Sequence, residues 1–149
     1  MYSAKTIANA FLDISSEHEK QLTNMKLQKL VYFAHGWSLA LDNGPLIHEA
    51  VKAWNFGPVI PPLYNVLRKY GNGVVKDKIE GINEEIEKIT QPLIKRIWEV
   101  YNRFTGIQLS AMTHRKDSAW DITYGKEPFS IINNKLIAEE FKKKLKKHG

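Results

Sequence analysis

The sequence contains no cysteine. Without thiols the chain has no disulfides, no thiolate nucleophile and no zinc site built on sulfur, and we expect a protein of the reducing cytoplasm. No stretch approaches the roughly 18 apolar residues of a membrane span, and the N-terminal segment does not combine a basic start with an uninterrupted apolar run. The sequence therefore predicts a cytoplasmic location and no contact with a membrane.

Recognised catalytic and metal-binding motifs are also missing. No glycine pattern matches a phosphate-binding or dinucleotide-binding loop, and no GxSxG sequence marks a nucleophile. None of the histidines belongs to an HExxH pattern or stands at i, i+4 from another: they are His18, His35, His48, His114 and His148. We therefore predict no metal, no cofactor and no catalytic activity, and we expect a binding protein.

The composition that is present is typical of a globular protein. Of 149 residues, 43% are hydrophobic and 26% are charged. Four Trp, six Tyr and six Phe supply large side chains for a core. Because domains commonly run to about 100–150 residues, we expect a single domain over residues 1–149.

The main structural signal is an apolar helix over about residues 25–41, MKLQKLVYFAHGWSLAL. Apolar side chains occupy nearly all of its sides, which is typical of a helix surrounded by protein. Gly36 within it predicts a close crossing with another helix. His35 is interpreted as a buried, hydrogen-bonded side chain. The expected fold class is mainly α, a compact helical domain around this buried central helix.

Caps and prolines indicate the other strong helices. Ser3 favours the start of a first helix. Pro61 and the proline after it suit the first turn of a short helix that Gly71 closes, and Pro92 suits the start of a helix that Gly106 ends.

The remaining segments carry weaker signals. Residues 82–89 could form an extra helical turn, and residues 107–125 one or two short turns. Regular structure is expected to stop at Gly57 and Pro58, so that β structure amounts to at most a short element near 50–56 or 73–80. An Asn cap predicts a last helix that buries Leu136, Ile137, Phe141 and Leu145.

The formal charge of +6 is concentrated near the end of the chain, in a lysine-rich run from Lys142 to Lys147. Cations are favourable at a helix C-terminus, and we interpret the run as a solvated helix end. Clustered lysines also suit phosphates, so a nucleic acid or an acidic partner is an alternative.

The segment Trp54 to Tyr64, WNFGPVIPPLY, is unusually rich in aromatic residues and prolines. Such a loop either covers a core or presents a stiff surface to a partner, and both interpretations stay open. As an interface, it would have Lys52, Arg68 and Lys69 nearby to steer the encounter.

A polar group near residue 115 allows a third, enzymatic hypothesis. His114, Asp117 and Ser118 could be the parts of a hydrolase centre. The favoured interpretation is structural: Asp117 or Ser118 caps the helical turn that carries Trp120.

Three blocks of this sequence together resemble the Panacea domain family of SocA-like or GepA-like, phage-associated antitoxins. They are MKLQKLVYFAHGWSLA from Met25, AWNFGPVIPPLY from Ala53 and LSAMTHRKDSAW from Leu109. The family usually has Ser-Pro-Trp where this chain has Ser118, Ala119 and Trp120. The matching positions are Lys26, Leu27, Lys29, Leu30, Tyr32, Phe33, Trp54, Gly57, Pro58, Val59, Pro61, Leu63, Tyr64, Thr113, His114, Ser118 and Trp120.

The resemblance implies a compact, mostly helical antitoxin that neutralises a toxin encoded nearby by binding it directly, with no cofactor. It assigns no oligomeric state. The predicted partner-binding residues are Trp54, Phe56, Pro58, Pro61, Tyr64 and Arg68. The motif residues expected to act structurally are Lys26, Leu27, Leu30, Tyr32, Phe33, Gly57, Thr113, His114, Ser118 and Trp120.

Overall fold

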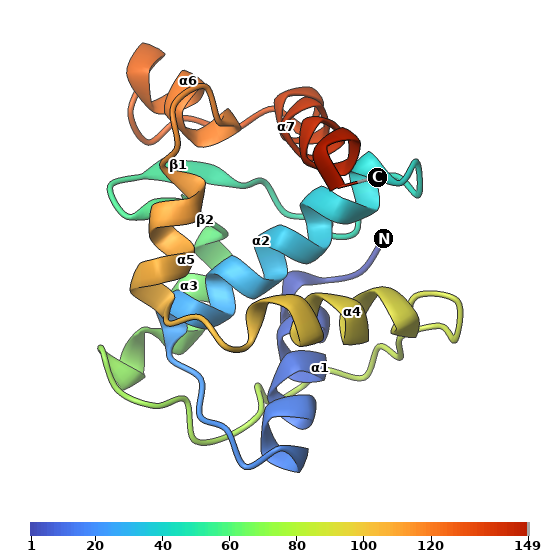
Figure 1. Ribbon diagram of the computed structural model, residues 1–149. Helices are drawn as coiled ribbons and strands as arrows, with labels where there is room; N and C mark the ends of the chain where they lie inside the picture. Colours follow the sequence, from blue (N-terminus) through green and yellow to red (C-terminus); the bar gives the residue numbers. More distant parts are fainter. Residues whose placement is uncertain (149) are drawn as a thin grey trace.

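Helix α2, Asn24–Ala40, crosses the middle of the molecule, and the other elements pack around it (Figure 1). The computed structural model describes residues 1–148 and confirms the mainly α fold class. The other elements are α1 Ala4–Glu17, β1 Lys52–Trp54, β2 Gly57–Val59, α3 Pro61–Leu67, the 3-10 turn η1 Arg68–Tyr70, α4 Gln91–Tyr101, α5 Gly106–Thr113, α6 Ala119–Lys126 and α7 Asn134–His148.

The burial of α2 on nearly all sides explains this arrangement. It packs against α1, α3, α4, α5, α7 and β2, and Thr23 caps its first turn by accepting a hydrogen bond from the Lys26 N–H. Phe33 stacks on Tyr101 of α4 with ring centroids 4.4 Å apart. Phe141 of α7 lies across Gly36, where an added Cβ would be 2.5 Å from its ring, so the predicted close helix crossing is confirmed.

His35 is buried and hydrogen-bonded, as predicted. Its ring joins two segments distant in the sequence to α2. Its Nδ1 accepts from the N–H of Leu46 at 3.1 Å, so its Nε2 is the atom that donates to Asn134 Oδ1 at 2.9 Å. Burial lowers the pKa of His35, which favours this neutral tautomer.

Strands β1 and β2 form an antiparallel hairpin whose last pair is Trp54 with Gly57. The predicted β element near 50–56 is confirmed, but the expectation that regular structure stops at Gly57 and Pro58 is wrong, since both residues lie in β2. Residues 129–132 run along the outer edge of β1 and exchange backbone hydrogen bonds with it. Residues 73–80 contribute an isolated bridge at Val74 and no strand.

Gly106 was predicted to end a helix and instead begins α5. The preceding helix ends at Tyr101, and Thr105 forms a capping box with Gln108. Residues 106–126 accordingly carry two eight-residue helices, more than the short turns expected over residues 107–125, and Ser118 caps the second as predicted.

One further expectation is met only in part, and another is wrong. Of residues 82–89, only the end of the segment enters a hydrogen-bonded turn, in which the Glu87 carbonyl accepts from the Thr90 and Gln91 N–H groups. Glu84 lies in the irregular part and accepts hydrogen bonds from the Ser3 N–H and the Thr6 hydroxyl at the start of α1. These bonds lower the pKa of Glu84. Leu145, expected in the core, is 40% exposed on α7, whereas Ile137 and Phe141 are buried as predicted.

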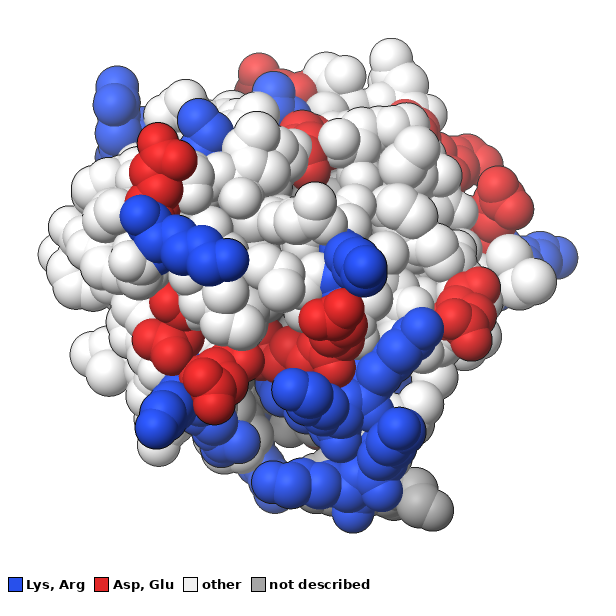
Figure 2. Space-filling model, turned by 90° about the horizontal axis from the view of Figure 1, so that it is seen from above, with Lys and Arg blue, Asp and Glu red and all other residues white. Residues whose placement is uncertain are grey.

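The lysine-rich run lies on α7, and Lys and Arg side chains gather at one edge of the face seen in Figure 2, beside acidic side chains. Lys142 pairs with Asp42 and Lys144 with Glu140, each at 3.5 Å. Lys144 also lies 4.4 Å from the ring centroid of Phe141. Part of the run is therefore engaged within the fold, as expected of a helix end.

The Gly36 crossing gives a stability prediction. Gly36→Ala should lower the free energy of unfolding by about 1–3 kcal/mol, because its Cβ overlaps the Phe141 ring. Gly125→Ala in α6 is the matched control, since its Cβ meets nothing within 4 Å; it should be neutral or stabilise by up to about 1 kcal/mol. Urea denaturation measures both, and equal effects would contradict the packing role of Gly36.

Candidate functional site

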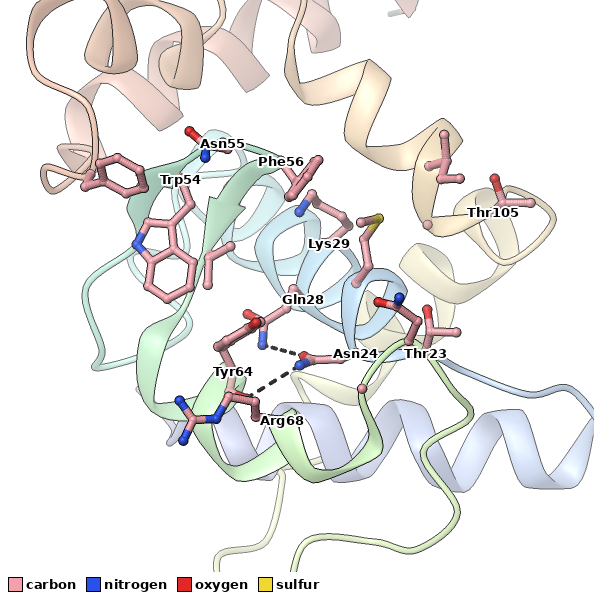
Figure 3. Close-up of a pocket in the computed structure, with 17 residues that line it drawn as sticks. Thr23, Asn24, Gln28, Lys29, Trp54, Asn55, Phe56, Tyr64, Arg68 and Thr105 are labelled. Carbon is pink, nitrogen blue, oxygen red and sulfur yellow. Dashed lines mark hydrogen bonds between the residues drawn. The ribbon is translucent and has the colours of Figure 1, made fainter.

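A pocket of about 800 Å³ opens beside the first turns of α2 (Figure 3). The hairpin, α3 with its 3-10 turn, and the start of α5 surround it. Its lining residues are Thr23, Asn24, Met25, Gln28, Lys29, Trp54, Asn55, Phe56, Val59, Tyr64, Arg68, Gly71, Asn72, Thr105, Gly106, Ile107 and Phe129.

Two helix N-termini meet at this pocket. Thr23 caps α2 and Thr105 caps α5. Gly106 lets the two first turns lie against each other, because a Cβ there would be 3.2 Å from the Lys26 backbone nitrogen. Helix N-termini carry partial positive charge, so this part of the pocket favours an anionic group.

A chain of amide groups joins α2 to the segment after the hairpin. Gln28 accepts from the Ile60 N–H at 3.0 Å and donates to Asn24 Oδ1 at 3.1 Å. Tyr64 packs edge-on against Trp54, with ring centroids 5.1 Å apart. These contacts fix the wall of the pocket that the second sequence block supplies.

The hairpin tip is anchored by side chains of the third sequence block and of α6. Trp120 Nε1 donates to the Trp54 carbonyl at 2.7 Å, and the Ser110 hydroxyl donates to the Phe56 carbonyl. The Tyr124 hydroxyl donates to Asn55 Oδ1 at 2.6 Å. The tip is therefore held in place although its side chains are exposed.

Lys29 is the unusual residue of the site, because it is a charged side chain only 1% exposed. Its side chain extends from α2 toward Phe56 and the hairpin (Figure 3). Its Nζ donates to the Pro58 carbonyl at 3.3 Å, and no ion pair within residues 1–148 includes it. Burial lowers the pKa of Lys29 to about 8.

Gly57 allows the three sequence blocks to meet around Lys29. Its φ is +110°, and a Cβ there would be 2.7 Å from Thr113 Oγ1 and 3.0 Å from Lys29 Cε. The hairpin backbone therefore passes between α2 and α5 at a distance that only glycine permits. Residues far apart in the sequence become one site at this contact.

The mouth of the pocket is apolar and solvent-exposed. Phe56 is 66%, Ile107 76% and Phe129 51% exposed, and all three line the pocket. Large apolar side chains clustered at the rim of a cavity are typical of binding surfaces.

Four of the six predicted partner-binding residues line the pocket: Trp54, Phe56, Tyr64 and Arg68. Pro58 is buried and offers its carbonyl to Lys29, so it forms part of the wall beneath the surface. Pro61 begins α3 and does not belong to the lining found among residues 1–148.

The residues predicted to act structurally lie mostly inside the fold. Leu27, Leu30, Tyr32, Phe33, Gly57, Thr113 and Ser118 are buried. Lys26 Nζ donates to the Asn102 carbonyl, and Trp120 is half-buried against the ring of His114 with centroids 3.9 Å apart.

The three hydrolase candidates are not arranged as a nucleophile and its base. The Ser118 hydroxyl donates to the Thr113 carbonyl at 2.7 Å and accepts from the Asp121 N–H, which is a capping role. His114 Nε2 is buried and has no hydrogen-bond partner among residues 1–148. Burial and the nearby Lys29 charge lower the pKa of His114. This geometry gives the hydrolase hypothesis no support.

Sequence reasoning assigned no binding role to Lys29, Ile107 and Phe129. The signal for Lys29 was a charged residue within a helix that is otherwise apolar on nearly all sides. Ile107 and Phe129 are isolated apolar residues in short connecting segments, and only the fold brings them beside Phe56.

Comparison with known proteins decides the family. The model for the SocA-like antitoxin, Panacea domain, matches residues 27–121. Antitoxin SocA of Caulobacter vibrioides (strain NA1000 / CB15N) is 30% identical over 129 residues, which cover 80% of this chain and 69% of that protein. The chain belongs to the SocA-like antitoxin, Panacea domain family. No solved structure matches it.

Membership in the Panacea family confirms the resemblance read from the three sequence blocks and, at the level of the family, the antitoxin role. The matched range runs from α2 into α6. Helices α1 and α7 lie wholly outside it and nevertheless pack on α2. Over residues 1–148, no helix is long and apolar enough to cross a membrane.

The buried charge of Lys29 gives a second stability prediction. Lys29→Met keeps the length of the side chain and removes the charge, so at pH 7 it should raise the free energy of unfolding by up to about 3 kcal/mol. Thermal and urea unfolding measure the change, and the exposed Lys76→Met is the control.

The pH dependence of that difference has a defined sign. The folded-state pKa of Lys29, about 8, lies below the model value of 10.5, so the folded state loses its proton first. The cost of the buried charge is complete below pH 8 and disappears as the pH rises from about 8 to 10.5. The advantage of Lys29→Met should therefore shrink over this range; an advantage that grows with pH would contradict the assignment. His114 is the neighbouring titratable group, and its pKa is already lowered.

Proposed function

We propose that this chain is an antitoxin that neutralises a partner toxin by binding it directly, and that the surface around the α2–hairpin pocket is the docking face. Family membership is the observation that carries the antitoxin role. An antitoxin family favours a non-enzymatic role, in which inhibition follows from occupying the toxin surface. The whole of residues 1–149 would act as one Panacea domain, in the cytoplasm, as expected from a sequence without cysteine.

The choice of docking face is supported by three features of the pocket. It is large enough, at about 800 Å³, to take several side chains of a partner. Its rim carries the exposed apolar residues Phe56, Ile107 and Phe129. Its aromatic wall, Trp54 against Tyr64, is of the residue types enriched in interface hot spots.

The lysine-rich run on α7 supports the alternative of nucleic-acid binding less well. Lys142 and Lys144 already pair with carboxylates of this chain. Neighbouring anions reduce the number of phosphates that a basic cluster can neutralise. The pocket is therefore the favoured functional surface.

Co-expression tests the proposal. The toxic product of a neighbouring open reading frame should stop growth alone, and this chain should restore growth and co-purify with it. Ile107→Ser should weaken the complex by about tenfold or more, because it removes an exposed apolar contact at the rim. Affinity is measured by calorimetry on purified proteins.

The matched control is Ile89→Ser, which alters an 85% exposed isoleucine outside the pocket. Its affinity and its growth rescue should equal those of the unaltered chain. Failure of the unaltered chain to rescue growth or to bind a neighbouring toxin would contradict the proposed function. Equal losses for the two isoleucines would contradict the choice of docking face.

A further inference from the structure

The hydrogen bonding of Lys29 leaves part of its ammonium group unused. An ammonium has three N–H donors, and the single acceptor found for Lys29 within residues 1–148 is the Pro58 carbonyl at 3.3 Å. Buried charges in proteins are normally paired or bind an ion. The structure thus holds a buried cation at the wall of a pocket with capacity to bind an anion.

The other charged groups around the pocket are also positive. Arg68 is the second charged residue of the pocket, and no Asp or Glu of residues 1–148 contributes to the lining. The N-termini of α2 and α5 add partial positive charge from their first turns. Each of these positive groups would attract an anionic group that enters the pocket.

We propose that the pocket receives an acidic side chain of the toxin, an Asp or Glu whose carboxylate pairs with Lys29. Apolar residues beside that carboxylate would contact Phe56, Ile107 and Phe129 at the rim. This inference rests on the proposed function and deepens it, because it names the chemistry of the toxin segment that the antitoxin recognises. A carboxylate supplies acceptors for the free N–H groups of Lys29, and binding excludes water from the pair.

A purely structural role explains Lys29 poorly. Its one hydrogen bond is long for a charged donor, and its burial opposes the charged state. A methionine would fill the same space beside Gly57 and Thr113 without that cost. The structural and the binding explanations therefore predict opposite results for one substitution.

The test combines stability and affinity for Lys29→Met. The variant should be at least as stable as the unaltered chain and should bind the purified toxin about 30-fold more weakly or worse. Lys76→Met, at an exposed lysine outside the pocket lining, should bind normally. Each toxin Asp is then replaced by Asn, and each Glu by Gln, one at a time. One of these substitutions should weaken binding to the unaltered chain and cause little further loss of affinity for the Lys29→Met variant.

The outcomes separate this inference from the proposed function. If the unaltered chain neutralises the toxin and Lys29→Met binds within about twofold of it, the antitoxin role stands and the Lys29 inference is wrong. A large loss of affinity without any coupled toxin carboxylate also overturns the inference. If no complex forms at all, the proposed function fails.

A peptide titration tests the pocket without the toxin, and it therefore applies even if no complex with the toxin forms. The peptides acetyl-Phe-Glu-Leu-amide and acetyl-Phe-Gln-Leu-amide differ in one charge. Titrated at millimolar concentration into chain labelled with ¹³C at the lysine ε-carbons, the Glu peptide should shift the Lys29 signal and the Gln peptide should not. Equal shifts, or no shift with either peptide, would count against a carboxylate-binding pocket.

Discussion

The fold depends on the burial of one helix from all sides. Because α2 has apolar side chains around nearly its whole circumference, it requires neighbours on every side, and five helices and a strand supply them. Segments from both ends of the chain are thereby brought to the same core, α1 against one side of α2 and α7 against another. The positions of the hairpin and of α5 follow from the same requirement.

One buried lysine interrupts this apolar surface, and the pocket forms beside it. Lys29 lies on the part of α2 that the hairpin covers, and the backbone of Gly57 passes close to it. The contact explains why three separated blocks make one pattern: the first supplies the cation, the second the backbone that covers it, and the third the side chains that hold this backbone. Their spacing in the sequence reflects a single packed contact in space.

The sequence predicted the parts of this structure that depend on local patterns. Helical spacing and caps identified α1, α2, α3 and α7, and the glycine within α2 marked the crossing with Phe141. The sequence mispredicted the role of Gly106, because a glycine that ends a helix and a glycine at a close contact between helices cannot be distinguished from the sequence alone. It missed β2, because strand pairing with β1 overrides the local preference of Gly57 and Pro58. Ile107 and Phe129 join the pocket through tertiary contacts alone.

The anchoring of the hairpin tip has a consequence for how such a surface recognises other molecules. Hydrogen bonds from Ser110, Trp120 and Tyr124 fix the tip before any encounter. Docking at the proposed face would then cost little conformational entropy, and association would proceed close to the rate of rigid-body encounter. Differences in complex lifetime between partners would consequently originate in the partners' own contact residues, since this side of the interface has little freedom to adapt.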